Sequence, residues 1–232
     1  MREFAPILEG RENWHGRCNI PRHRHARPYA ALVLSGGYEE SGNLGRYRVR
    51  SGQVLLHRSF DAHLDRFEAR GAGVLNLLLK EEPLFGLACV EDPDAIARIA
   101  ERDAAAAAAA LQARLERVEP VVTDWPDLLA QDLIEDPQLR LDGWARRYGL
   151  AQESVSRGFK KVFAASPAGF RAEARAQVAL ARIANDSVSL ARVAAEAGFA
   201  DQSHMTRAVT ALTGRPPGHW RRSNPFKIPQ PP

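Results

Sequence analysis

An internal repeat in the last part of the chain constrains the fold more than any other sequence feature. The segment "LDGWARRYGLAQESVSRGFKKVFAASPAGFR" at 141–171 aligns with "LARVAAEAGFADQSHMTRAVTALTGRPPGHWR" at 190–221, at an offset of 49 residues that becomes 50 after one insertion. The paired positions include Leu141 with Leu190, Ala145 with Ala194, Gly149 with Gly198, Leu150 with Phe199, Arg157 with Arg207, Phe159 with Val209, Pro167 with Pro217, Phe170 with Trp220 and Arg171 with Arg221. The repeat predicts two copies of one structural unit.

Each copy predicts a short helix, a turn and a second helix, which is a helix-turn-helix. A glycine suits each turn because it adopts positive φ without a Cβ clash, and Asp201 is expected to cap the second helix of the second unit. The stretch "SPAGFRAEARAQVALARIAND" predicts a long connecting helix. Its inward residues are expected to be Phe170, Ala174, Val178, Ala181 and Ile183.

The second helix of each unit has an apolar stripe and an outward face that suits DNA. The stripes are Val155, Phe159 and Phe163 in the first unit and Met205, Val209 and Leu212 in the second. The outward residues expected to meet base edges are Glu153, Ser156, Arg157, Gln202, Ser203, Thr206 and Arg207. Those expected to meet phosphates are Lys160, Lys161, Arg221 and Arg222.

Charge divides the chain near Asp136. Residues 1–136 carry 17 lysines and arginines against 22 acidic residues, whereas residues 137–222 carry 14 against 6. A basic segment that contains the repeat favours a polyanionic partner. No apolar run approaches the roughly 18 residues of a membrane span, and the first residues have no secretory signal pattern, so we expect a cytoplasmic protein without a membrane partner.

Residues 137–222 resemble the AraC-type DNA-binding domain. The second unit of that family typically has Gly-Phe, a few polar residues, Ser, Arg, and then Gly-x-x-Pro with an aromatic residue before Arg; "GFADQSHMTR…TGRPPGHWRR" fits this pattern. The resemblance implies that one monomer reads two successive major grooves of double-stranded DNA with the outward residues named above. One departure is Val209-Thr210, where the family usually has Phe-Lys.

The part of the chain before the repeat changes from a strand pattern to a helix pattern. From Pro28 to Lys80, short apolar or alternating runs separated by Gly-containing turns predict a small antiparallel barrel or sandwich. From Pro93, an alanine-rich stretch predicts helix, with Ala107, Leu111, Leu115 and Val118 along one face. That stripe covers the barrel or forms a dimer seam.

Two histidines one residue apart, His23 and His25, point to the same side if they lie on one strand, and a hairpin partner would bring His63 opposite them. Three histidines suit zinc or a similar divalent ion; the alternative is a solvated basic edge. His57 is a fourth candidate, but a strand-end histidine with a hydrogen bond is the favoured explanation of it.

AraC-type regulators commonly carry a cupin-like sensor barrel, and "HRH" at 23–25 with "GQVLLHRSFDAH" at 52–63 resembles the two cupin motifs. Metal cupins usually add a Glu four or five residues after the second His, where this chain has Tyr29 and Ala30. Trp14, Tyr29 and Tyr38 are expected either to line an effector pocket or to belong to the core.

Together these patterns predict an α+β chain. Residues 1–92 are expected to form an antiparallel, cupin-like β-barrel that acts as the sensor, 93–136 a helical linker and candidate dimerisation segment, 137–222 an all-α DNA-binding domain with two helix-turn-helix units joined by a long helix, and 223–232 a flexible tail.

The function predicted for such a chain is a transcription regulator, not an enzyme. Its expected partners are double-stranded DNA, an unidentified small-molecule effector, a second copy of the chain, and RNA polymerase if it activates. One divalent metal is the expected cofactor. The alternative is a metal-dependent cupin enzyme with a C-terminal interaction module, which needs a complete metal shell with an open position.

Overall fold

The computed structural model describes residues 4–121, 124–136 and 139–222. Contacts divide the chain into two compact units, here called the N-terminal unit, which ends at residue 122, and the C-terminal unit, which begins at residue 123. The boundary predicted after residue 136 therefore lies inside the C-terminal unit. The expected flexible tail, 223–232, lies outside the described residues. No described helix has both the length and the apolar character that a membrane crossing requires.

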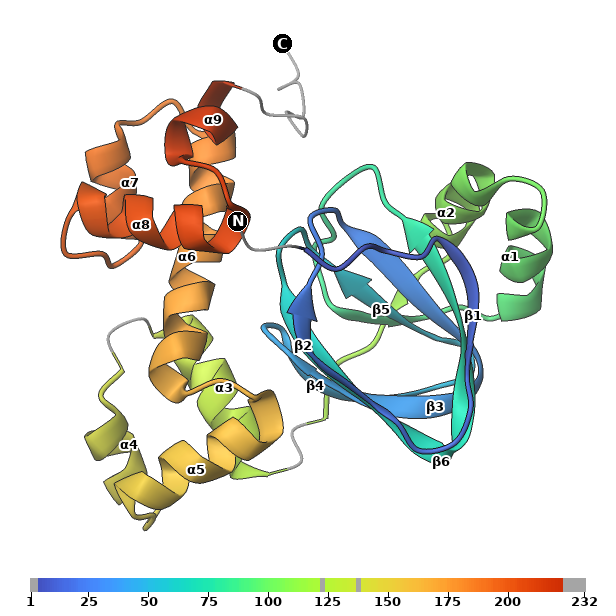
Figure 1. Ribbon diagram of the computed structural model, residues 1–232, viewed down its shortest axis with the longest axis horizontal. Helices are drawn as coiled ribbons and strands as arrows, with labels where there is room; N and C mark the ends of the chain where they lie inside the picture. The colour runs from blue at the N-terminus through green and yellow to red at the C-terminus, as the bar shows by residue number, and fades with distance from the viewer. Residues whose placement is uncertain (1–3, 122–123, 137–138, 223–232) are drawn as a thin grey trace. The chain divides into compact units, whose positions relative to one another are not determined.

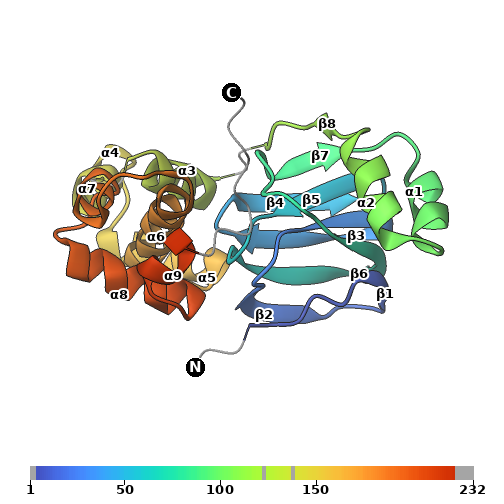
Figure 2. The ribbon, with the colours of Figure 1, turned by 90° about the horizontal axis from the view of Figure 1, so that it is seen from above.

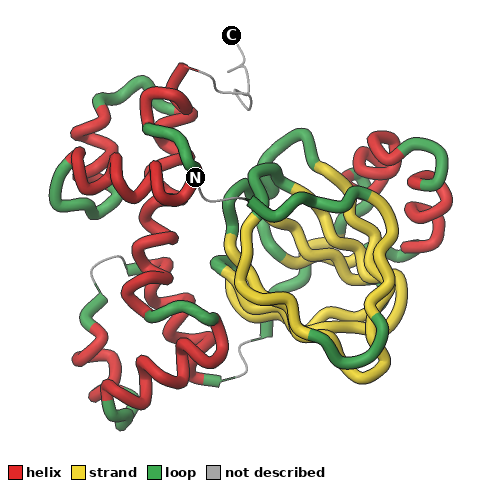
Figure 3. The backbone as a smooth tube through the Cα atoms, viewed as in Figure 1, coloured by secondary structure: helices red, strands yellow, loops and turns green. Residues whose placement is uncertain are grey.

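The N-terminal unit contains one antiparallel sheet of eight strands (Figures 1 and 3). In chain order the strands are β1 (Gly10–Trp14), β2 (Asn19–Arg24), β3 (Tyr29–Gly42), β4 (Gly45–Arg50), β5 (Gln53–His57), β6 (Ala62–Leu78), β7 (Leu87–Cys89) and β8 (Glu116–Arg117). The prediction of antiparallel strands in this part of the chain is confirmed.

The two long strands, β3 and β6, pair along almost their whole lengths and bend together. The register shifts between Val33 and Ser35 and again between Gly36 and Tyr38. At this bend a Cβ on Gly36 would lie 2.1 Å from the carbonyl oxygen of Gly71, and both glycines have positive φ. The close approach of the two backbones therefore requires glycine.

The bend divides the sheet into two halves that share β3 and β6. One half of β3 pairs with β5 and the other with β4, while β6 pairs with β1 and β2 in the same way. The expected closed barrel is not formed: the strand order runs β1-β6-β3-β5-β7-β8, and no ladder among the described strands joins β1 to β8. The physical reason is that β1 uses its pairing on β6, and β8 is only two residues long.

The sheet has two apolar faces because alternate residues of a strand point to opposite sides. Along β3, Tyr29, Ala31 and Val33 belong to an inner cluster, whereas Ala30 and Leu32 belong to an outer one. Two helices, α1 (Pro93–Ala100) and α2 (Ala104–Gln112), cover the outer cluster (Figure 2).

The alanine-rich stretch folds into two helices because Asp103 starts a new one. Its side chain accepts a hydrogen bond from the Ala106 amide at 2.9 Å, which caps α2. Ala107 and Leu111 are fully buried in the outer cluster, and Leu115 packs against its edge. Three residues of the predicted stripe therefore pack in the outer cluster of their own unit, whereas Val118 packs against the inner cluster. Dimerisation through this segment stays a prediction, and the buried residues are not available for it.

The C-terminal unit is helical. Its elements are α3 (Trp125–Glu135), α4 (Leu141–Arg147), α5 (Gln152–Phe163), α6 (Pro167–Asn185), α7 (Leu190–Glu196), α8 (Gln202–Thr213) and α9 (Pro217–Arg222). Of the predicted 93–136 linker, α3 belongs to this unit: Leu129 and Leu133 are buried with Phe159, and Trp144 Nε1 donates to Asp132 Oδ2 at 2.6 Å. Helix α3 thus completes the core of the first helix-turn-helix.

Both predicted helix-turn-helix units are present, as α4 with α5 and α7 with α8. Gly149 and Gly198 lie at the turns with φ of 65° and 75°, and Asp201 caps α8 by accepting from the His204 amide at 2.7 Å. The two predicted stripes on α5 and α8 are buried. These expectations are confirmed.

The buried stripe of α6 differs in part from the prediction. Phe170 and Ile183 are buried, but Val178 is 51% exposed and Ala181 is exposed. The other buried residues are Pro167, Ala176, Ala179 and Leu180. The reason is that α6 packs against α3 and α5 near one end and against α7, α8 and α9 near the other, so its buried face is not a single straight stripe.

One arginine in each copy of the repeat holds the start of that copy's first helix. Arg171 donates from Nη1 to the Leu139 carbonyl at 2.8 Å, and Arg221 donates from Nη2 to the Val188 carbonyl at 2.7 Å. Leu139 and Val188 are equivalent at the offset of 49 residues. In both copies of the repeat, therefore, an arginine at the end of the repeated segment is hydrogen-bonded to a carbonyl just before the first helix of that copy.

A residue after each second helix provides a stability test. Ala164, which ends α5, has φ of 51°, and the equivalent Gly214, which ends α8, has φ of 72°. Because alanine is strained in the left-handed region, we expect Ala164→Gly to raise the free energy of unfolding by up to about 1 kcal/mol and Gly214→Ala to lower it by about 1 kcal/mol. Urea unfolding measures both.

The control is Ala172→Gly, an exposed position inside α6. There the same exchange is expected to lower the free energy of unfolding by about 1 kcal/mol, because glycine is a poor helix former. Loss of stability in Ala164→Gly as large as in Ala172→Gly would contradict the argument.

Candidate functional sites: a DNA-binding face and a histidine-lined cavity

The outward faces of α5 and α8 hold the residues predicted to read bases. The exposed ones are Glu153, Arg157, Gln202, Ser203 and Arg207, while Ser156 and Thr206 are half-buried. Lys160, Lys161 and Arg222, predicted to meet phosphates, are exposed as well. The two helices thus present polar and basic side chains opposite their buried stripes.

Several acids of this unit are already used by partners away from the outward faces of α5 and α8. Asp142 pairs with Arg140 and Arg146, and Glu196 pairs with Arg192. Asp186 pairs with Arg182, and Asp201 is used as a helix cap. Within the described residues neither Arg157 nor Arg207 forms an ion pair with these acids, so both keep their donors for an outside acceptor.

Arg221 has a different place from the one predicted. Its guanidinium is half-buried and donates to the Val188 carbonyl, so it holds α9 against the start of α7. The sequence pattern assigned it to phosphates because it is basic and lies beside Arg222. Its partner in the repeat, Arg171, makes the equivalent internal bond, and that equivalence is the signal that identifies a structural role.

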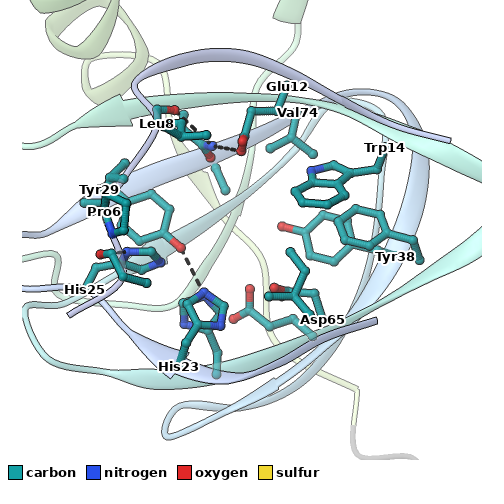
Figure 4. Close-up of a pocket in the computed structure, with 18 of the residues that line it drawn as sticks. Pro6, Leu8, Glu12, Trp14, His23, His25, Tyr29, Tyr38, Asp65 and Val74 are labelled. Carbon is teal, nitrogen blue, oxygen red and sulfur yellow. Dashed lines mark hydrogen bonds between the residues drawn. The ribbon is translucent and has the colours of Figure 1, made fainter. Parts of the chain in front are cut away.

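The inner face of the sheet in the N-terminal unit encloses a cavity of about 470 Å³ (Figure 4). Its walls come from β1, β2, β3 and β6 and from residues 5–8, which precede the first strand. The predicted pocket residues Trp14, Tyr29 and Tyr38 all line it, and so do the predicted metal ligands His23, His25 and His63. Residues far apart in the sequence therefore meet at one cavity.

The three histidines are brought together by the pairing of β2 with β6. His23 lies directly opposite His63 in the register, and their ring centroids are 4.3 Å apart. The ring centroid of His25 lies 4.8 Å from that of His23. One nitrogen of each ring lies within 4.8 Å of the other two, which is a spacing that one metal ion could bridge.

Two of the rings are held in the tautomer that a metal needs. His23 Nδ1 lies 2.9 Å from the Pro21 carbonyl oxygen, and His25 Nδ1 lies 2.8 Å from that of Ala5. A carbonyl only accepts, so each Nδ1 carries the proton and each Nε2 keeps a free lone pair. Burial lowers the pKa of His23 and of His25, which favours the neutral ligand form at neutral pH.

A second group of possible ligands shares His63. Glu40, His57 and His63 are all buried and also offer ligand atoms within 4.8 Å of one another. His63 Nδ1 and His57 Nε2 have no hydrogen bond within the described residues, although His57 Nε2 lies 3.5 Å from Glu40 Oε2. Burial lowers the pKa of His57 to about 3 and that of His63 well below its ordinary value.

Tyr29 links the two groups. Its hydroxyl lies 3.2 Å from His63 Nε2, and its ring stacks on that of His57 with centroids 4.2 Å apart. Tyr29 stands where the cupin pattern places a glutamate, whereas Glu40 supplies a carboxylate from the other end of the same strand. The sequence pattern missed Glu40 because it searched only four or five residues beyond His25.

Further carboxyl groups in the cavity were also missed. Glu40 and Asp65 are opposite each other in the β3·β6 register; burial raises the pKa of Glu40 well above its ordinary value and that of Asp65 to about 7. Glu12 accepts a hydrogen bond from Asn76 Nδ2 at 2.7 Å. The alternation of Tyr38 with Glu40 and of His63 with Asp65 was the available signal, since residues two apart share a face.

Comparison with known proteins finds a family model that matches part of the C-terminal unit. Residues 144–223 match a family model described as a helix-turn-helix domain, which is about a third of the chain. A comparison with curated protein sequences gives no match.

Several solved structures are similar. The C-terminal domain of AraT, a response regulator from Geobacillus stearothermophilus, is 17% identical, with 50% of this chain and 95% of that one covered and a TM-score of 0.41. A probable AraC family transcriptional regulator from Rhodopseudomonas palustris is 15% identical, with 41% and 93% covered and a TM-score of 0.39. ToxT from Vibrio cholerae is 10% identical, with 92% and 96% covered and a TM-score of 0.40.

The matched segment begins inside α4 and contains α5 through α9. It therefore includes most of both copies of the repeat described above. The resemblance of this part of the chain to the AraC-type DNA-binding domain is therefore confirmed. At the level of class, the protein contains a helix-turn-helix domain.

The buried His57 ring predicts a pH dependence in metal-free protein. The folded state keeps His57 neutral down to a pKa of about 3, whereas the unfolded chain takes up a proton near pH 6.5, so this residue lowers stability as the pH falls below 6.5. Between pH 7 and pH 5 we expect wild type to lose about 2 kcal/mol more than His57→Asn. Urea unfolding with a chelator at both pH values measures the difference.

The control is His15→Asn, because His15 is exposed and its ring is in water in both states. This variant should follow the wild-type pH dependence. Equal losses in His57→Asn and wild type would contradict the burial of a neutral ring.

Proposed function

We propose that this protein binds specific sites on double-stranded DNA with α5 and α8, and that a ligand or metal ion in the N-terminal cavity controls this binding. The observation that carries the first part is the repeated helix-turn-helix with exposed polar and basic faces. Arg157 and Arg207, equivalent in the repeat, are suited to bidentate bonds to guanine, and Gln202 to adenine. Lys160, Lys161 and Arg222 would contact phosphates.

The metal part of the proposal is supported by the three histidines at the cavity. His23 and His25 have their Nδ1 protons on carbonyls and their Nε2 atoms free, and His63 Nδ1 is buried without a partner. Neutral imidazoles suit zinc or a similar divalent ion, which would also satisfy the buried nitrogen. When bound, the ion would supply positive charge and fixed geometry at one end of the cavity.

The remaining parts of the proposal follow from a regulatory role. The occupant of the cavity would favour one state of the protein over another, which requires different affinities for the two states. A second copy of the chain and, for an activator, RNA polymerase would be further partners, and the location would be the cytoplasm. We propose a sensor rather than an enzyme because the chain carries a DNA-binding domain as its output.

The DNA-binding proposal is tested with fragments recovered from the genome by the full-length protein. In mobility-shift titrations we expect Arg207→Ala to lose about 1–3 kcal/mol on the preferred site and to discriminate less between sites. Lys160→Ala should weaken all sites alike and reduce the salt slope by about 1.

The control for these variants is Arg192→Ala, which removes an exposed cation outside α5 and α8. It should leave site preference unchanged. Unaltered preference in Arg207→Ala would argue strongly against base reading by α8. Arg221→Ala is expected instead to lower stability, through loss of its bond to Val188.

The metal proposal is tested by equilibrium dialysis of the full-length protein against Zn²⁺. We expect about one ion per chain, and stabilisation of about 2.7 kcal/mol when free Zn²⁺ is 100 times its dissociation constant. His63→Ala should abolish both effects, while exposed His15→Ala should preserve them. Equal zinc uptake by His63→Ala and wild type would refute this site.

A further inference from the structure

The cavity is much larger than a metal site requires. A single water occupies roughly 30 Å³ of liquid, whereas the cavity measures about 470 Å³, within the range of pockets that hold small organic molecules. The three histidines line only one part of it. The remaining walls include aliphatic side chains, aromatic rings and carboxyl groups (Figure 4).

The aromatic wall consists of three rings in a row. Trp14 stacks on Phe67 with centroids 5.0 Å apart, and Phe67 stacks on Tyr38 with centroids 4.9 Å apart. All three residues line the cavity. The face of an aromatic ring is electron-rich and attracts a cation, most strongly when water is excluded.

The carboxyl groups lie at separate points of the same cavity. In Figure 4, Glu12 lies at one side near Leu8 and Val74, and Asp65 lies at the opposite side, with its carboxyl group directed into the space between them. Asp65 is 5% exposed, and its Oδ1 has no hydrogen-bond partner among the described residues. Asp65 Oδ1 is therefore a buried acceptor without a donor from the described residues, on a side chain that lines the cavity.

The cavity supplies little positive charge to balance these carboxyls. Within the described part of the chain, no lysine or arginine forms an ion pair with Glu12, Glu40 or Asp65, and Glu40 and Asp65 are hydrogen-bonded to each other. One arginine, Arg22, lines the cavity, and its guanidinium donates to the Asn43 side chain. A hydrogen bond between two carboxyls needs a proton on one of them, so the other carries the charge. A buried carboxylate of this kind favours a cationic ligand, because a buried charge needs a partner.

The arrangement fits an organic cation better than a second metal ion. Glu12 and Asp65 belong to neither group of side chains whose ligand atoms converge, and a metal ion needs its ligands around one point. Aromatic faces do not coordinate hard cations. A molecule with an ammonium group and an apolar body would contact the separated carboxyls and the rings together.

We propose that the effector of this protein is a small organic ammonium compound, bound with its charged nitrogen at Asp65 and its apolar part against Trp14, Phe67 and Tyr38. This inference rests on the proposed role of the cavity as the effector site. It does not require a metal at the histidines, since Glu12, Asp65 and the three rings belong to neither group of converging ligand atoms.

The test is calorimetric titration of the full-length protein, without DNA, with benzylamine, 2-phenylethylamine and 1,4-diaminobutane. Each amine is paired with its neutral alcohol and its carboxylate counterpart of similar length. We expect at least one amine to bind about tenfold or more tightly than both counterparts, because a hydrogen bond to a charged partner contributes about 1.5–3 kcal/mol.

Variants locate the binding. Asp65→Asn and Glu12→Gln should each weaken amine binding about tenfold while leaving the alcohol unchanged, and Trp14→Leu should weaken both. The matched control is Glu68→Gln, an exposed carboxylate on the same strand as Asp65. If Asp65→Asn fails to fold, the measurements on Glu12→Gln and Trp14→Leu decide the question. Both positions are only half-buried, so these variants are expected to fold.

The inference is overturned if no amine binds more tightly than its alcohol, or if the carboxamide variants bind the amine as wild type does. Because the titration contains no DNA, its outcome is separate from that of the DNA-binding proposal. An amine that binds at the cavity but leaves the mobility-shift affinity unchanged would support the ammonium site itself and refute its role as the effector site.

Discussion

The antiparallel pairing of β3 with β6 is the interaction on which the N-terminal unit depends. These two strands pair through the bend at Gly36 and Gly71, and β1, β2, β4 and β5 hydrogen-bond to one or the other of them. The bend turns the inner face of one half of the sheet toward that of the other. Because of this, Tyr29 at the start of β3 reaches His63 near the start of β6.

The same pairing sets the electrostatics of the cavity. It places Glu40 directly opposite Asp65, and the pairing of β2 with β6 places His23 opposite His63. Carboxyls and neutral imidazoles are thereby buried close together in a space lined by aromatic rings. Buried polar groups of this kind are costly unless they have partners, so this cavity lowers the stability of the N-terminal unit.

The sequence allowed the C-terminal unit to be predicted in detail because its information is local and occurs twice. The glycine turns, the Asp201 cap and the buried stripes of α5 and α8 follow from residue types at short spacing. The place of Arg221 was not predicted, since a bond to the Val188 carbonyl depends on how α9 meets α7. The break before α2 was missed because seven alanines favour helix and obscured the capping role of Asp103.

In the N-terminal unit, the convergence of His23, His25 and His63 could be expected from strand alternation and a family pattern. The roles of Glu40, Asp65 and Glu12 could not, because they depend on the register of β3, β6 and β1 and on two bulges in β3 that no short motif encodes. Closure of the sheet was predicted wrongly for a related reason: which strands pair is a long-range property, and the two-residue β8 leaves no pairing that closes the sheet.

The bond from His25 to the Ala5 carbonyl makes the beginning of the chain part of the cavity. Residues 5–8 line it, and the Ala5 amide donates in turn to the Arg24 carbonyl at 3.1 Å. Trimming these residues would release the tautomer of His25 and open one wall to water. Purification tags for work on this cavity therefore belong at the other end of the chain, and N-terminal truncations should be treated as mutations of the site.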